Sequence, residues 1–230
     1  YNKFKGPISL RSAVAESRNV PSVKLLYLVG LEDALASANA LGLNMGSKDR
    51  YGLSLVLGGG EVTLLNMVGA YGVFANSGVR NQSVSILEIT DRKGNIIEKY
   101  EPTPMQAFDQ NASLIINDVL SDPVARAPTF GSSITIPGVA VKTGTTNDDK
   151  DAWIVGYTPT LVAGVWSGNN RNESMRSGGS AVSGPIWKTF FTEVLKESPA
   201  PLFEKPMPDS EYDTLKPILR GNWMGNSVIE

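Results

Sequence analysis

Residues 139–167 contain three strand-like segments joined by very short connections. The segments 139–146, 152–157 and 160–167 are rich in small and β-branched residues, which is typical of strands. Residues 147–150 form the first connection, and Thr158-Pro159 forms the second. A parallel crossover needs about a dozen residues or more, so these connections allow only antiparallel neighbours. The sequence therefore predicts a three-stranded antiparallel meander.

The hydrophobic period predicts mostly helices before residue 80 and a mixture of strands and helices after it. We expect helices at 7–16, 20–29, 31–41 and 61–76, with a glycine-rich loop at 43–60. A hairpin of strands 83–90 and 96–100 and a helix at 109–120 follow, and then a loop rich in proline, glycine and serine before residue 139. After the meander we expect a loop at 170–184, a helix at 185–196 and an extended tail. Helices come first and a mainly antiparallel sheet covered by helices follows. This order is an α+β architecture.

The same pattern predicts which apolar side chains face inward. On the first helix we expect Leu10, Ala13 and Val14 to be buried. On the helix at 61–76, the residues at helical spacing are Leu64, Leu65, Val68, Tyr71, Gly72 and Ala75. On the last helix, we expect the sheet to be covered by Ile186, Phe190, Phe191 and Val194. Trp153, Trp166 and Trp187 are expected at the interface of sheet and helix, and Trp223 in the tail is a candidate contact with another domain.

Two absent residue types exclude several chemistries. The 230 residues contain no cysteine and no histidine, which excludes disulfides, thiol nucleophiles, a Ser-His-Asp triad and sites with imidazole or thiolate zinc ligands. Acid–base chemistry would fall to Lys, Asp, Glu or Tyr. The net charge of −2 gives no reason to expect nucleic-acid binding. Because the chain begins at Tyr1 rather than at methionine, we expect a segment of a longer protein.

The first strand of the meander carries a candidate binding site, Lys142-Thr143-Gly144-Thr145. In a regular strand Thr143 and Thr145 share one face and Lys142 lies on the other, so both sets could meet one ligand only on an edge strand that lines a cleft. Gly144 would let an extended peptide lie alongside the strand, and the Thr145 N–H could donate to a developing oxyanion. The structural alternative is an ordinary edge strand with a solubilising lysine.

A second candidate, Ser17-Arg18-Asn19, lies at the junction of two expected helices. Serine and asparagine commonly cap helices, so a capping role is the structural alternative. The functional interpretation is that Ser17 passes a proton while Asn19 donates to a substrate carbonyl.

These two motifs, Ser-x-Asn and Lys-Thr-Gly-Thr, resemble two of the three motifs of the serine penicillin-recognising enzymes. Their surroundings resemble the transpeptidase domain of class A (bifunctional) penicillin-binding proteins over residues 5–195. The similar segments are GPISLRSAVAESRNVPSVK at 6–24, EVTLLNMVGAYGVFANSG at 61–78, VKTGTTNDDKDAWIVGYTPTLVAGVWSGN at 141–169 and the loop at 178–187.

One departure from that family concerns the nucleophile. The third motif is Ser-x-x-Lys, and no serine in this sequence has a lysine three positions later. We therefore expect residues 1–197 to be the C-terminal portion of a transpeptidase domain that is inactive alone, followed by an extended proline-rich tail at 198–230.

The resemblance implies a role for each motif residue. An upstream serine would attack a D-Ala-D-Ala stem peptide, Ser17 would relay a proton to the leaving group, and Asn19 would hold the substrate amide. Lys142 would steady the relay by its charge, the Thr143 and Thr145 hydroxyls would bind the terminal carboxylate beside Gly144, and the Thr145 N–H would complete an oxyanion hole. No metal and no cofactor is implied.

The implied partners are peptidoglycan stem peptides and β-lactam antibiotics, with a glycosyltransferase domain and a membrane anchor upstream and an extracytoplasmic location. Two alternatives stay open: a non-catalytic relative that binds muropeptides or a cell-wall partner, and a serine β-lactamase. Glu61 faintly resembles the deacylating glutamate of class A β-lactamases, but we expect it to be structural at a helix start. The pair Asp148-Asp149 is expected to be a solvated turn rather than an acid–base dyad.

Overall fold

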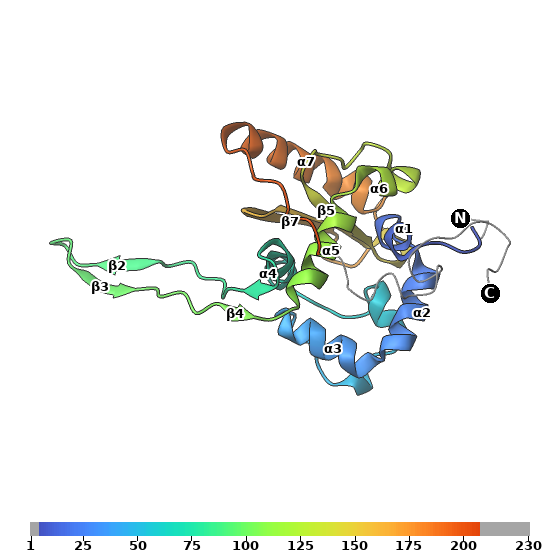
Figure 1. Ribbon diagram of the computed structural model, residues 1–230, viewed down its shortest axis with the longest axis horizontal. Coiled ribbons are helices and arrows are strands. Elements are labelled where there is room, and N and C mark those ends of the chain that lie inside the picture. Colours follow the sequence, from blue (N-terminus) through green and yellow to red (C-terminus); the bar gives the residue numbers. More distant parts are fainter. Residues whose placement is uncertain (1–4, 208–230) are drawn as a thin grey trace.

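The computed structural model describes residues 5–207, and its centre is the predicted meander (Figure 1). Strands β5 (Ala140–Thr145), β6 (Asp151–Thr158) and β7 (Leu161–Gly168) form one antiparallel sheet in the order β5-β6-β7. Helices cover both faces of this sheet. The expected α+β architecture is confirmed, and the short connections are the physical reason that the strands pair in sequence order.

Helix α7 (Gly179–Glu197) covers one face of the sheet. Its Trp187 and Phe191 are fully buried against Val139, Val141 and Ile154. Trp187 fits there because Gly156 of β6 has no side chain: a Cβ at Gly156 would lie 2.1 Å from the Trp187 Cζ2 atom. The sheet-facing residues of the last helix are thus an aromatic pair one turn apart.

Several expectations for α7 are wrong. The helix begins at Gly179 rather than at residue 185 and contains Pro185 in its interior. Ile186 and Phe190 are exposed, as is Trp166, while Trp187 is buried as expected. The buried stripe follows Trp187 and Phe191 rather than Ile186 and Phe190, because the fit of Trp187 over Gly156 decides which face docks on the sheet, and apolar spacing alone does not.

Helices α4 (Leu64–Ala75) and α5 (Gln110–Leu120) cover the opposite face, where Ala75, Leu120, Ala140 and Tyr157 form a second core cluster. The buried Tyr157 hydroxyl donates to Asn117 Oδ1 at 2.8 Å. Asn117 Nδ2 in turn donates to the Phe74 carbonyl at 2.9 Å, so the polar groups at this interface are satisfied.

The start of α4 differs from the expectation. Thr63 is the N-cap and its hydroxyl accepts from the Asn66 N–H, so Glu61 lies before the helix and not in its first turn. Leu65, which was expected to follow the inward spacing, is exposed. The threonine cap makes the helix begin at that point, because its hydroxyl satisfies an otherwise unpaired N–H of the first turn.

The N-terminal helices are α1 (Leu10–Ala15), α2 (Asn19–Val29) and α3 (Leu31–Ala40), and the expected loop at 43–60 contains two 3-10 turns, η1 (Lys48–Arg50) and η2 (Leu53–Leu57). On α1 the small residues Ala13 and Ala15 are buried, whereas Leu10 is 62% and Val14 is 39% exposed. The prediction that Leu10 and Val14 face inward is therefore wrong for the described residues.

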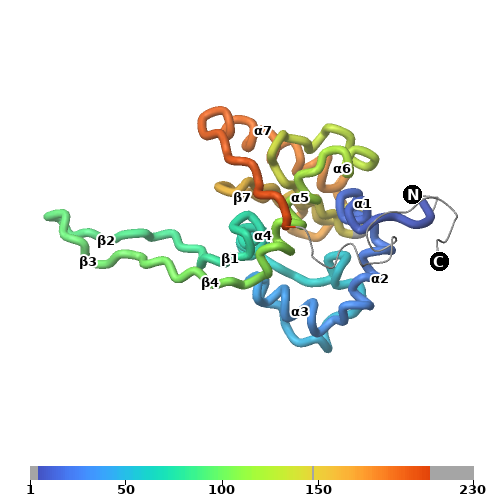
Figure 2. Tube along the Cα trace, viewed as in Figure 1, coloured from blue at the N-terminus to red at the C-terminus, as the bar shows by residue number. Residues whose placement is uncertain are grey.

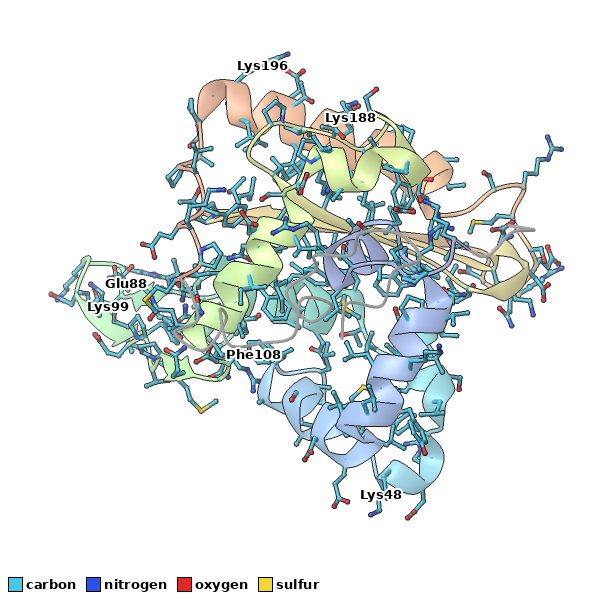
Figure 3. All side chains as sticks on the ribbon, turned by 45° about the vertical axis from the view of Figure 1, so that its right-hand side comes forward. Lys48, Glu88, Lys99, Phe108, Lys188 and Lys196 are labelled. Carbon is cyan, nitrogen blue, oxygen red and sulfur yellow. The ribbon has the colours of Figure 1, made fainter. Side chains whose placement is uncertain are left out.

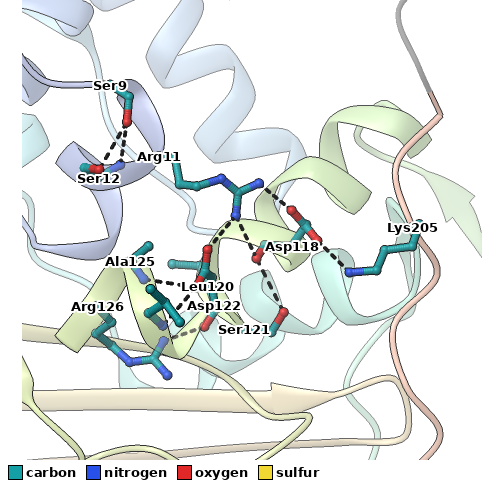
Figure 4. Close-up of polar contacts among 11 residues, drawn as sticks. Ser9, Arg11, Ser12, Asp118, Leu120, Ser121, Asp122, Ala125, Arg126 and Lys205 are labelled. Carbon is teal, nitrogen blue, oxygen red and sulfur yellow. Dashed lines mark hydrogen bonds and ion pairs between the residues drawn. The ribbon is translucent and has the colours of Figure 1, made fainter. Parts of the chain in front are cut away.

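Helix α6 (Pro123–Phe130) was not expected from the sequence. Asp122 caps it by accepting from the N–H groups of Val124 and Ala125, and Pro123 occupies the first turn, where its missing N–H costs nothing. Arg11 of α1 binds the carboxylates of Asp118 and Asp122 (Figure 4), which fastens α1 to the α5–α6 corner.

A two-stranded hairpin projects from the body of the molecule (Figures 1 and 2). Strands β1 (Val79–Arg80) and β4 (Met105–Gln106) pair at its base, and β2 (Glu88–Thr90) and β3 (Ile96–Lys99) pair further out. Glu88 and Lys99 face each other at 3.7 Å (Figure 3). The hairpin is confirmed, but its first strand is shorter than the expected 83–90.

The described part of the tail packs against the body. Phe203 meets the Tyr157 ring at a centroid distance of 5.5 Å, and Lys205 binds Asp118 at 3.0 Å (Figure 4). The proposed division at residue 198 stays a prediction, and Trp223 lies outside the described residues. Within 5–207, no helix has the length and apolar character needed to cross a membrane, and no cluster of acidic residues suited to a metal ion is found.

Candidate active site

Ser17 follows α1 in a tight reversal of the chain. The Arg18 N–H donates to the Ala13 carbonyl at 2.9 Å and the Ser17 N–H donates to the Val14 carbonyl at 3.1 Å, which is the bonding pattern of a Schellman turn. Ser17 holds the left-handed position of this turn, with φ 56°, where glycine is usual. The serine is exposed and its hydroxyl points away from the helix end toward the sheet, because Lys142 binds it there.

Asn19 is the first residue of α2, and its side chain is exposed. The N-cap of α2 is Arg18, which makes no side-chain capping bond. The capping interpretation of Ser17 and Asn19 is therefore wrong for this junction. Both side chains are exposed, and that of Ser17 contacts Lys142 of β5.

Lys142 joins the two candidate motifs. Its Nζ donates to the Ser17 Oγ at 2.7 Å, a contact between residues 125 positions apart, and to the Thr143 carbonyl at 2.7 Å. Burial lowers the pKa of Lys142 from 10.5 to about 8, so the side chain still carries its proton at pH 7. Within residues 5–207 no carboxylate forms an ion pair with it. A cation without a counter-ion is suited to polarise a neighbouring hydroxyl or to attract an anionic ligand.

Strand β5 is an edge of the described sheet, and its free edge offers backbone groups. The Thr146 N–H donates to the Asp151 carbonyl at 3.2 Å, so that opposed pair is hydrogen-bonded. Bonded and non-bonded pairs alternate in antiparallel strands, and therefore the N–H and C=O of Thr145 point to the free edge. Thr143 has the same orientation, which is why its carbonyl is reached by Lys142. The Thr145 N–H is thus available to a ligand lying along β5.

The two threonine side chains lie on the face of β5 opposite Lys142, as expected from a regular strand. Thr143 is buried on the α7 side, and Thr145 is exposed. The Thr145 hydroxyl accepts from the Gly179 N–H at 2.9 Å and so caps the start of α7. A hydroxyl that accepts one bond still has its own proton to donate, so Thr145 can bind an anion as well.

The glycine positions allow close packing behind this edge. A Cβ at Gly144 would lie 3.3 Å from the Trp153 Cβ, and one at Gly179 would lie 2.5 Å from the Gly144 carbonyl oxygen. Gly178 is similarly close to Thr145, at 2.7 Å. The start of α7 therefore sits directly against the end of β5, which only glycines permit.

Asp151 supports the end of β5 and was missed by the sequence reasoning. Its Oδ1 accepts from Trp166 Nε1 at 2.9 Å, and its Oδ2 accepts from the Thr146 hydroxyl at 3.1 Å. Strand register provides the signal that could have revealed it, because the Thr158-Pro159 turn sets Asp151 opposite Gly168, two positions from Trp166 along β7 and on the same face. Asp148 and Asp149 lie in the adjacent turn, both with positive φ, and the Asp149 N–H donates to the Thr146 carbonyl at 3.2 Å.

Comparisons with known proteins agree with this geometry. Residues 1–192 match the family model of the penicillin binding protein transpeptidase domain. The chain is 34% identical to Penicillin-binding protein 1A/1B of Bacillus subtilis (strain 168) and 36% identical to Penicillin-binding protein 1A of Aquifex aeolicus (strain VF5), in each case over 89% of this chain. It spans only 24% and 28% of those relatives' lengths.

Solved structures share the fold. The structure of the PonA1 protein from Mycobacterium tuberculosis in complex with penicillin V superposes with a TM-score of 0.74 at 23% identity, over 87% of this chain and 60% of that one. Penicillin-Binding Protein 1A from Haemophilus influenzae gives 0.76 at 21% identity, over 89% and 37%. With the sequence match over most of its length, the chain therefore belongs to the penicillin binding protein transpeptidase domain family.

Proposed function

We propose that this chain provides the Ser-x-Asn and Lys-Thr-Gly-Thr part of a serine-type DD-transpeptidase site that cross-links peptidoglycan stem peptides and binds β-lactams. The observation that carries the proposal is the contact of Lys142 Nζ with Ser17 Oγ at 2.7 Å beside the free edge of an edge strand. It unites a cation, a hydroxyl and a strand edge suited to an extended peptide. The PonA1 structure with penicillin V supports the β-lactam part of the proposal.

The proposed reaction begins with attack by a serine oxygen on the carbonyl of a D-Ala-D-Ala unit. The serine C–O bond to the acyl group forms, the C–N bond to the terminal D-Ala breaks, and the serine proton reaches the leaving amine through the Ser17 hydroxyl. Because Lys142 donates to Ser17 Oγ, the Ser17 proton is free to point toward the leaving group. An amine of a second stem peptide then takes the acyl group, which restores the serine and forms the cross-link.

The remaining groups stabilise and orient the substrate in this scheme. The Thr145 N–H, which points to the free edge, donates to the oxyanion that forms during attack. The terminal carboxylate is attracted by the Thr143 and Thr145 hydroxyls and by the Lys142 charge. Gly144 gives the peptide backbone room beside β5, and the exposed Asn19 amide holds the substrate amide. A bound cephalosporin or penicillin would use the same contacts, because its carboxylate and carbonyl mimic those of D-Ala-D-Ala.

The acylated serine belongs, in this proposal, to a Ser-x-x-Lys motif outside these residues, since no such motif occurs among the 230. The chain spans only 24% and 28% of two 1A-type relatives, which would leave room in the whole protein for the glycosyltransferase domain and membrane anchor that the class A resemblance implies. An extracytoplasmic location follows from the proposed substrate.

Intact-mass spectrometry with a fluorescent penicillin tests the proposal on the full-length protein and on this chain alone. We expect a mass increase of one ligand in the full-length protein and none in this chain. Labelling of neither would favour a non-catalytic muropeptide-binding protein. Labelling of this chain would place the nucleophile inside it and contradict the proposal. Rapid turnover of a chromogenic cephalosporin would instead indicate a β-lactamase.

A further inference from the structure

The turn that presents Ser17 is strained, and its neighbours offset the strain. A non-glycine residue in the left-handed region is disfavoured, and Ser17 has φ 56°. Glycine would fit the turn better but has no hydroxyl for Lys142. The turn therefore needs an additional restraint if the Ser17 oxygen is to stay within 2.7 Å of Lys142 Nζ.

Glu16 and Arg18, on either side of Ser17 in the sequence, supply such a restraint. The Glu16 Oε2 accepts from Arg18 Nε at 3.0 Å and from Arg18 Nη2 at 2.5 Å. The same oxygen accepts from Lys5 Nζ at 2.6 Å. The Glu16 side chain is only 6% exposed and that of Arg18 is 21% exposed, whereas Lys5 is 46% exposed, so the Arg18 bonds are the more shielded from water.

The carboxylate is firmly ionised in this environment. Burial by itself would raise the pKa of Glu16, but the hydrogen bonds and charges of Lys5 and Arg18 outweigh it, and the pKa lies below its ordinary value. The Glu16 charge is thus balanced by two cations next to it rather than by Lys142, whose pKa is shifted by burial alone.

We propose that Glu16 is a positioning residue for the Ser17 hydroxyl: by binding Arg18 across the turn, it keeps Ser17 in the left-handed conformation that presents Oγ to Lys142. The inference rests on the proposed function, in which Ser17 relays a proton. It assigns to Glu16 no contact with the substrate. The ion pair of Arg11, the second residue of α1, with Asp118 stabilises the same helix without spanning the Ser17 turn, so it provides a control.

A double-mutant cycle in the full-length protein tests this role. The rate constant of acylation by a fluorescent penicillin is measured for wild type, Glu16→Ala, Ser17→Ala and the double variant. We expect Glu16→Ala to lower the rate by roughly tenfold to a hundredfold, the effect of a small misplacement of a reacting group. In the Ser17→Ala background it should have less than about a twofold effect, because Glu16 would act only through Ser17. Glu16→Gln, which keeps an amide oxygen for Arg18, should restore part of the rate.

A second readout does not depend on acylation. Hydrogen exchange at the Ser17 and Arg18 amides should be faster in Glu16→Ala than in wild type, and unchanged in Asp118→Ala, even if both variants unfold at a lower temperature. Equal rate losses for Glu16→Ala in both backgrounds, or unaltered exchange at these amides, would overturn the inference. If the wild-type protein fails to acylate, the proposed function fails. Hydrogen exchange still tests the restraint in that case: faster exchange at the Ser17 and Arg18 amides in Glu16→Ala than in wild type supports it, and unaltered exchange contradicts it.

Discussion

Replacing Lys142 with methionine separates the charge of this side chain from its packing. Methionine has similar length and no charge, so it can fill the same space. A fall in pKa from 10.5 to about 8 corresponds to at most about 3.5 kcal/mol of desolvation cost at pH 7, at about 1.4 kcal/mol per pKa unit. The substitution removes that cost and leaves Ser17 Oγ, which is exposed, to water. We therefore expect the free energy of unfolding to stay within about 1 kcal/mol of wild type or to increase.

The effect on acylation should be far larger. Lys142→Met removes a charged donor from the Ser17 oxygen and a positive charge from the proposed carboxylate site. Loss of one well-placed donor in a transition state costs about 100-fold to 1,000-fold in rate, and we expect a loss of at least that size here. The difference between a large catalytic loss and an unchanged fold is the signature of a site residue.

The assay is labelling of the full-length protein by a fluorescent penicillin, followed in time, with thermal unfolding measured on the same samples. Lys188→Met is the matched control, because Lys188 Nζ also makes two hydrogen bonds, to the carbonyls of Ser132 and Ser133, but on the α7 side of the molecule. That control should acylate at the wild-type rate. A Lys142→Met protein that acylates within about threefold of wild type would refute the assignment of β5 as the substrate strand.

Three further outcomes follow from the same structure. Acylation should fall above pH 8 as Lys142 loses its proton. The free energy of unfolding should rise between pH 8 and pH 10.5, because over that range the unfolded lysine keeps a proton that the folded one has released. Both trends should vanish in Lys142→Met, as pH titrations of the acylation rate and of urea unfolding will show. Thr145→Ala should lower acylation by less than about tenfold because the Thr145 N–H remains, and should destabilise by about 1 kcal/mol through loss of the cap on Gly179; a loss as large as that of Lys142→Met would contradict this. Gly156→Ala should destabilise by about 2 kcal/mol or more, because its Cβ would overlap the buried Trp187 ring; wild-type stability in urea would show that the packing argument is wrong.

The sequence by itself determined the local parts of this protein. Connection lengths were sufficient to predict the order and direction of β5, β6 and β7, because a short link permits only one way for neighbouring strands to pair. The turn at 91–95 was equally local, with Asp91 accepting from the N–H groups of Lys93 and Asn95. The alternation of Lys142 against Thr143 and Thr145 also follows from strand geometry alone.

The tertiary structure alone decided how these parts meet. The approach of Ser17 to Lys142 joins residues 125 positions apart, and no local pattern fixes such a contact. The start of α7 depended on the fit of Gly179 against β5, where bare backbone lets two elements touch. The left-handed Ser17 was also hidden, since serine has no preference for that conformation and here takes the position of the turn after α1 where glycine is usual. Local preferences act over a few residues, whereas a site is made by packing between segments far apart in the chain, and packing depends on the whole fold.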